Sequence, residues 1–323
     1  MRSIAIVIMI SANAFPCAAN FEPHFLLRLI MSLAAPLFIF LSGFTSTLSK
    51  DGRANLKTSL ALLCSACFVD TIVWGIIPFY TFDVLYCIAV AGLINSLVPY
   101  SNLRLYLLLG LTLMAYFFIH YFLQYHIEIN ELNLNETDMF RFSDIQNQGL
   151  INGWFPLFPW MAFAFLGRYY GMNRSQIDAL LLKIRPLFLL LLPITVFFTF
   201  NDAQTPVRMG YIEIFYPPSF QYLLVAFIWI ASLLSLKKEF SRVQSNSYFL
   251  VIGKSSLLIY ILHALVNHYI LESLDLSLKA LPYTMLIVFL VIFFSAVAFL
   301  HQSIRTHQFL KSWPLFIRKI FGI

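Results

Sequence analysis

About ten apolar segments follow one another along this chain of 323 residues, and most are close to twenty residues long. A transmembrane helix needs about 20 apolar residues, because it must cross about 30 Å of hydrocarbon. We place the segments at about 3–19, 25–48, 56–79, 82–99, 103–125, 155–171, 185–200, 218–236, 247–271 and 280–301. Composition agrees, since 11% of the residues are charged, against about 25% in soluble domains. The sequence therefore predicts an all-α, polytopic transmembrane helix bundle.

Lysine and arginine concentrate in alternate connections between these segments. They occur around 50–57, at 104, over 168–185, over 237–242 and in the tail 305–319, whereas the other connections are mainly acidic. Positively charged residues are retained on the cytoplasmic side of a membrane, so both termini are predicted to be cytoplasmic. The net charge of +6 reflects the same asymmetry and favours anionic membrane lipids as partners. No motif indicates binding to nucleic acid.

No linker divides the chain, so we expect one membrane domain over 1–301 and a basic amphipathic cytoplasmic tail over 302–323. Such a tail is expected to lie along the membrane surface. The first segment also fits a secretory signal, since Arg2 and an apolar run precede Cys17-Ala18-Ala19. Cleavage there would leave nine helices in the same orientation. The compact connections favour a bacterial inner membrane.

A charge lies inside the second apolar segment. His24, Arg28 and Ser32 follow one another at intervals of four and therefore share one helical face. A charged residue at membrane depth is a candidate for function, because it is costly unless it faces a partner or a cavity. The Arg28 guanidinium favours a neutral His24 imidazole, which could act as a base. An interfacial histidine in contact with headgroups is the alternative, and Asp70 or Asp83 could neutralise Arg28.

The ninth segment carries a second polar stripe. Ser256, Tyr260, His263 and Asn267 are spaced by four, three and four residues, which predicts one helical face. The alternative to a site is hydrogen bonding between helices, a common use of such residues in membranes. Lys254 is either a ligand for a substrate phosphate or a lysine that reaches back to the interface.

Familiar catalytic motifs are missing from the sequence. We find no P-loop, no His-Glu-x-x-His helix, no Gly-x-Ser-x-Gly elbow and no Gly-x-Gly-x-x-Gly turn. Hydrolytic and nucleotide-driven functions therefore lose support, and no metal site is predicted.

Five segments together carry a family resemblance. They are Arg2 through Asn13 with His24 eleven residues later, Ala35-Pro36 through Ser42-Gly43, Asp83-Val84-Leu85-Tyr86, Phe155-Pro156-Leu157-Phe158-Pro159-Trp160 with Gly167, and Gly253-Lys254-Ser255-Ser256 through Tyr260 and His263. In this order they resemble the catalytic domain of the heparan-alpha-glucosaminide N-acetyltransferase family, within the clan of multipass membrane acyltransferases.

The resemblance implies an enzyme that moves an acetyl group from cytoplasmic acetyl-CoA to an amino sugar or glycan on the outer side of the membrane. It implies His24 as the proton acceptor, Asn13 as a hydrogen-bond donor to the thioester or oxyanion, and Arg28 as the orienting residue. It also implies a cofactor-binding set of Lys254, Arg2, Tyr260, His263 and Ser256. Two alternatives stay open: O-acetylation of a cell-envelope polysaccharide, and a non-enzymatic carrier or flippase. A carrier would not release free CoA, and no paired halves typical of transporters are visible.

Overall fold

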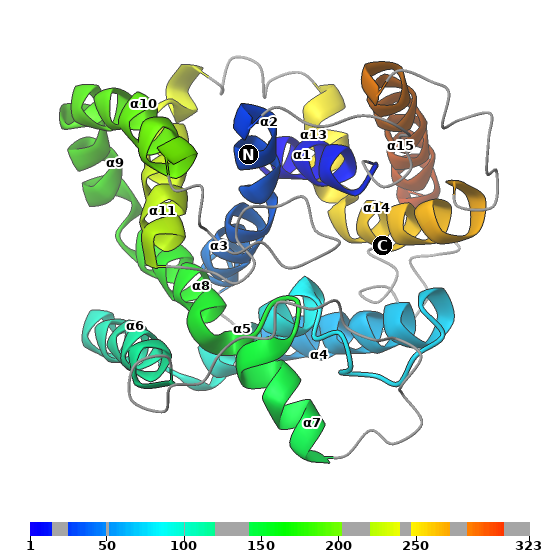
Figure 1. The fold of residues 1–323 in the computed structure, drawn as a ribbon, viewed down its shortest axis with the longest axis horizontal. Coiled ribbons are helices and arrows are strands. Elements are labelled where there is room, and N and C mark those ends of the chain that lie inside the picture. Colours follow the sequence, from blue (N-terminus) through cyan, green and yellow to red (C-terminus); the bar gives the residue numbers. More distant parts are fainter. Residues whose placement is uncertain are drawn as a thin grey trace.

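The computed structural model describes residues 1–14, 25–49, 52–99, 101–119, 142–201, 220–239, 247–271 and 283–306. Within these ranges the regular elements are all helical, as Figure 1 shows. In chain order they are α1 (Arg2–Ala14), α2 (Phe25–Ser32), α3 (Ala34–Ser46), α4 (Gly52–Phe68), η2 (Val69–Val73), α5 (Val84–Leu97), α6 (Asn102–Phe117), α7 (Phe142–Asn147), η5 (Gln148–Asn152), α8 (Leu157–Met172), α9 (Arg174–Lys183), α10 (Arg185–Asn201), α11 (Phe220–Ser235), α13 (Ser247–Lys254), α14 (Ser256–Leu265), η6 (Val266–Leu271) and α15 (Tyr283–Thr306). The three η elements are π-helical.

Each predicted apolar segment coincides with a helix or a broken helix, so the all-α fold class is confirmed for the described residues. Three stretches there are long and apolar enough to cross a membrane alone: Phe25–Ser46, Gly52–Val73 and Tyr283–Ile304. Three further helix pairs qualify only if each bent pair is one span, with bends of 60°, 72° and 71°. The number of crossings and the side of the termini stay predictions.

One of these bends directly precedes the predicted polar stripe of the ninth segment. The chain turns by 71° between Tyr248–Lys254 and Ser256–Ile270, and it becomes π-helical from Val266. The turn lies at Gly253-Lys254-Ser255, a glycine and serine sequence of the kind that commonly kinks helices. The stripe therefore lies beyond the bend, with Ser256, Tyr260 and His263 in α14 and Asn267 in η6.

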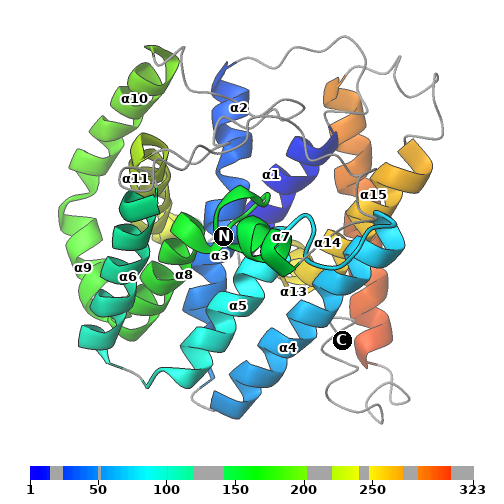
Figure 2. The same cartoon turned by 60° about the horizontal axis from the view of Figure 1, so that its bottom comes forward.

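The centre of the bundle is a close contact between α3 and α8 (Figure 2). Glycines make the approach possible. A Cβ on Gly43 would lie 1.8 Å from the Ala164 carbonyl oxygen, and a Cβ on Gly167 would lie 1.9 Å from that of Phe40. Small residues let helix backbones touch in this way in membrane proteins. The fully buried Trp160 of α8 packs in the same core.

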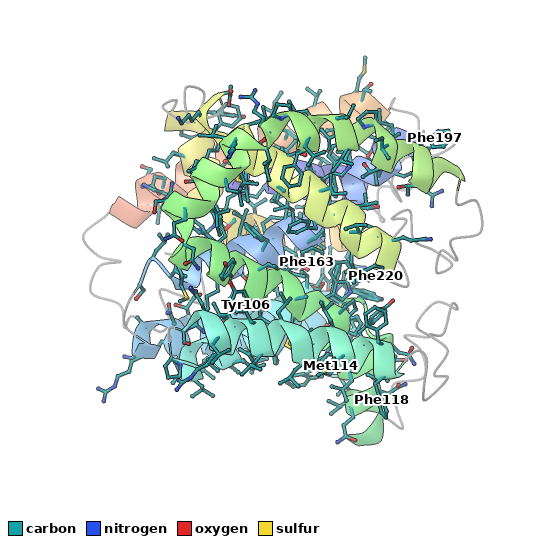
Figure 3. The ribbon with its side chains drawn as sticks, turned by 90° about the vertical axis from the view of Figure 1, so that its left-hand side faces the viewer. Tyr106, Met114, Phe118, Phe163, Phe197 and Phe220 are labelled. Carbon is teal, nitrogen blue, oxygen red and sulfur yellow. The ribbon has the colours of Figure 1, made fainter. Side chains whose placement is uncertain are left out.

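The surface formed by α6, α10 and α11 is apolar. Met114, Phe118, Phe197 and Phe220 are between 49% and 62% exposed, whereas Phe163 of α8 is 2% exposed. Figure 3 shows this face, with α6 and α10 outside α8 and α11. A broad exposed apolar surface of this kind fits contact with lipid rather than with water.

Candidate functional site

A cavity of about 880 Å³ opens at one end of the bundle. Its rim includes Ser46 and Ser49, where α3 ends, and Asn55, where α4 begins. In Figure 2 this is the lower end, from which α4 rises. Because the basic connections lie at this end, it is the predicted cytoplasmic side. The volume is in the upper part of the range for ligand sites, about 300–1,000 Å³.

The cavity runs deep along two helices. On α5 its lining extends from Asn95 near the rim to Val84 at the first turn, a rise of about 16 Å at 1.5 Å per residue. On α14 the lining residues are Ser256, Leu257 and Tyr260. Tyr260 therefore lies towards the inner end, together with Val84.

The lining carries positive charge and, among the residues that the structure describes, no carboxylate. Its two cations are Arg2 of α1 and Lys254 of α13, both exposed. The neutral polar residues are Ser42, Thr45, Ser46, Ser49, Asn55, Thr58, Ser59, Asn95, Ser256 and Gln302. Phe38, Leu41, Leu62, Leu85 and Ile88 supply apolar walls. The cavity suits an elongated ligand with an anionic end and a less polar arm.

A tyrosine–carboxylate pair lies at the inner end of the cavity. The Tyr260 hydroxyl donates to Oδ2 of Asp83, a residue that is 6% exposed and caps α5 by accepting from the Val84 N–H at 2.5 Å. His263 lies behind Tyr260, with ring centroids 5.0 Å apart and the rings at 70°. His263 is 5% exposed, and its Nδ1 is buried without a hydrogen-bond partner among the described residues.

A second buried carboxylate holds the loop that precedes Asp83. Asp70 is fully buried and accepts from Thr81 Oγ1 at 2.9 Å, from the Tyr86 hydroxyl at 2.7 Å and from the Phe79 N–H at 3.0 Å. On the sequence alone, either Asp70 or Asp83 could neutralise Arg28. The bonds that the structure assigns to both carboxylates come instead from hydroxyl and backbone N–H donors, which satisfy a buried carboxylate without a cation.

Four of the five residues predicted to bind the cofactor line the cavity: Arg2, Lys254, Ser256 and Tyr260. The fifth, His263, contacts Tyr260 from outside the lining. Lys254 lies before the bend at Ser255, and Ser256 and Tyr260 lie after it, so both sides of the bend line the cavity. Sequence spacing alone did not indicate this convergence.

Of the three predicted catalytic residues, the two that the structure describes do not line the cavity. Asn13 is exposed at the far end of α1, and its Nδ2 donates to the Met9 carbonyl at 2.9 Å. Arg28 is half-buried on α2, with its carbonyl accepting from Ser32 Oγ at 2.7 Å. His24 lies outside the described residues. The roles of all three stay predictions.

Several lining residues were missed from the sequence. Asn55, Asn95 and Gln302 were not singled out, because isolated amides near helix ends have no distinctive spacing. Gln302 was assigned to the tail, but α15 continues through Thr306; the rest of the predicted tail, 307–323, lies outside the described residues. Among the residues placed by the structure, no group of three or more His, Cys, Asp or Glu side chains could hold a metal ion.

Comparison with known families adds the deciding observation. The family model described as heparan-alpha-glucosaminide N-acetyltransferase, catalytic, matches residues 1–184, which is more than half of the chain. The chain belongs to this family. No curated protein and no solved structure matches it.

The match confirms the family suggested by the sequence motifs, and with it a membrane acyltransferase. The matched part includes Asn13, His24 and Arg28, and it also includes the α3 and α8 glycines. It ends before α10, so Lys254, Ser256 and Tyr260 lie beyond it. The lining of the cavity shows that residues beyond the matched part also contribute to the candidate site.

Proposed function

We propose that the chain transfers an acetyl group from acetyl-CoA, bound in the cavity from the cytoplasmic side, to an amino sugar or glycan on the outer side. The observation that carries the donor assignment is the lining of the cavity. Lys254 and Arg2 line it, and no described lining residue is acidic. A nucleotide with several phosphates fits there, because phosphate groups bind Lys and Arg side chains. The apolar walls fit the pantetheine arm.

On this proposal the thioester points towards Tyr260 and the outer half of the bundle. The acceptor nitrogen attacks the thioester carbonyl carbon and gives its proton to His24. The carbon–sulfur bond breaks, CoA leaves as the thiolate and takes up a proton, and the products are the acetylated amine and free CoA. Asn13 donates to the developing oxyanion, a contact of a kind worth about 3 kcal/mol. Arg28 orients the site.

The test uses the full chain purified in detergent and measures thiol release from acetyl-CoA and from acetyl-pantetheine, which lacks the nucleotide phosphates. Lys254→Ala is expected to raise the KM for acetyl-CoA about tenfold and to leave the KM for acetyl-pantetheine within about twofold. Lys183→Ala is the matched control, since Lys183 ends α9, is exposed and does not line the cavity. Equal KM values in all three proteins would contradict the donor assignment.

The acceptor panel separates the remaining alternatives. Release that requires an amino sugar supports N-acetylation, and release that requires only a glycan hydroxyl supports O-acetylation. Absence of both acetyl-CoA binding and thiol release, in folded protein, would favour the carrier function.

A further inference from the structure

Three π-helical turns meet at the end of the bundle opposite the cavity rim. Each carries or adjoins an aromatic residue: Trp74 directly follows η2, Trp154 lies two residues after η5, and His268 and Tyr269 lie within η6. We define Trp74, Trp154, His268 and Tyr269 as the outer aromatic cluster. The Trp74 and Trp154 rings are perpendicular, with centroids 5.9 Å apart, and the Trp74 and His268 centroids are 5.5 Å apart. π-helical turns occur frequently at functional sites.

The backbone beneath the cluster is unusual. Phe79 and Phe82 have φ values of 73° and 45°, a left-handed conformation that is costly for residues other than glycine. Such conformations persist where the surroundings impose them, and they gather at active sites and ligand clamps. Here Asp70 binds the Phe79 N–H and the Thr81 hydroxyl. The buried Asp70 carboxylate therefore fixes this loop.

This loop is joined directly to the segment that carries Trp154. The Trp154 and Phe155 N–H groups donate to the Thr81 and Phe82 carbonyls at 2.7 and 2.9 Å. Glycine permits the contact, because a Cβ on Gly153 would lie 2.5 Å from the Phe82 Cβ. Two loops from distant parts of the sequence therefore hold the tryptophans in a fixed relation, as the ribbon shows where the loop after α4 meets the one before α8 (Figure 1).

Polar groups accompany the aromatic rings. Gln148, at the start of η5, is 8% exposed, and its Oε1 is buried without a hydrogen-bond partner among the described residues. Its carbonyl binds the Gly153 N–H at 2.8 Å, so it belongs to the turn that leads to Trp154. On the other side, Asn267 Nδ2 donates to the Asn13 carbonyl at 2.9 Å. That bond places the predicted oxyanion donor beside η6 and its aromatic residues.

We propose that the outer aromatic cluster is the subsite that binds a sugar ring of the acceptor, an assignment that rests on the proposed function. A sugar ring presents an apolar C–H face and a polar rim. The half-buried tryptophan rings offer large apolar surfaces on which the C–H face of the sugar can pack. Amides such as that of Gln148 can accept hydrogen bonds from the hydroxyl groups of its polar rim. Aromatic residues also form belts at membrane interfaces. A belt needs neither π-helical turns nor a strained loop fixed by a buried carboxylate, and this cluster has both.

The test measures both steady-state kinetics and direct sugar binding with the full chain in detergent, using glucosamine and a β-1,4-linked glucosamine tetramer as probes. Trp74→Ala and Trp154→Ala are expected to raise the acceptor KM about tenfold, with the KM for acetyl-CoA within about twofold. Trp154→Phe should restore most of the affinity, because it retains an aromatic face. Phe118→Ala is the control, since Phe118 follows α6 directly, is exposed and lies outside the cluster.

Unchanged acceptor KM values in both alanine variants would overturn the proposal and leave an interfacial belt. Direct calorimetric binding of the tetramer separates this result from failure of the proposed function. If the wild type releases no CoA but binds the tetramer, and both alanine variants lose that binding, the sugar subsite is supported and the proposed acetyl transfer is contradicted. If the folded wild type binds no tetramer and shows no acceptor-dependent release, the subsite fails.

Discussion

The two ends of the bundle are built in different ways. At the cavity end, α-helices present small hydroxyl and amide residues and two exposed cations around an open space. At the opposite end, the buried carboxylate of Asp70, three π-helical turns and a left-handed loop fix aromatic side chains in place. The first arrangement suits a long, flexible anion, and the second suits a small group that must be oriented. α4, α5 and α14 reach from one end to the other, so each end can be tested while the other serves as its control.

The largest effect is expected from His24→Ala. Removal of a general base typically costs 10²- to 10⁴-fold in rate. Acetyl-CoA binding should be unchanged, because His24 is not among the residues proposed to bind the donor. The measurement is thiol release at saturating acetyl-CoA beside equilibrium binding of acetyl-CoA. Full activity in the variant would remove His24 from the mechanism.

Asp70→Ala should destabilise the outer end. The change leaves the Thr81 and Tyr86 hydroxyls without this acceptor and removes one of the two acceptors of the Phe79 N–H, which also donates to the Tyr86 hydroxyl oxygen. We expect a cost of about 3 kcal/mol in the free energy of unfolding. The measurement is unfolding in detergent. Glu239→Ala is the control, because Glu239 and its partner Arg185 lie at a partly exposed site, where an ion pair contributes about 0–1 kcal/mol. Equal stability of the two variants would argue against a fixed outer end.

Ser42→Leu should narrow the cavity without touching the outer end. Ser42 lies on α3 and lines the cavity. A larger apolar side chain there would occupy part of the volume in which we propose that acetyl-CoA binds. We expect the KM for acetyl-CoA to rise about tenfold, the scale of a lost contact worth about 1.4 kcal/mol. Binding of the sugar tetramer is the internal control. A change in sugar binding with unaltered acetyl-CoA affinity would reverse the assignment of the two ends.

Tyr260→Phe should have the smallest effect and reports on the junction between the two ends. It removes the hydroxyl that Asp83 accepts from and keeps the ring that contacts His263. A buried hydrogen bond to a carboxylate contributes about 1.5–3 kcal/mol to stability at most. Because Asp83 still accepts from Val84, we expect a few-fold fall in kcat with little change in either KM. A tenfold rise in the KM for acetyl-CoA alone would make Tyr260 a donor-binding residue instead.

The sequence predicted the parts of this molecule that depend on helical spacing and on charge. Apolar length predicted the helices, and the basic residue Lys254 followed by Ser256 and Tyr260 pointed to the cavity. The partners of the buried acids could not be predicted. Asp70 binds Thr81 and Tyr86 across a loop with left-handed residues, and neither hydrophobic periodicity nor residue spacing describes such a loop.

The tryptophans show the same limit of local patterns. Trp74 and Trp154 are eighty residues apart in sequence, and each follows a π-helical turn. A prediction of regular α-helix continues each helix straight through these turns. It gives no reason to expect contact between the Trp74 and Trp154 rings. The contact depends on the paired loops and on Gly153, which only the folded chain brings together.

The central claim is that the acetyl donor and the acceptor enter from opposite ends. The direct measurement uses vesicles reconstituted with the chain in one orientation, sorted by a tag after residue 323. α15 ends beside the cavity, where Gln302 is part of the lining, so we expect the tag to mark the donor side. The account predicts acetylated sugar when acetyl-CoA is supplied on the tag side and amino sugar on the other side. Product formed only when both substrates are on the same side would contradict it.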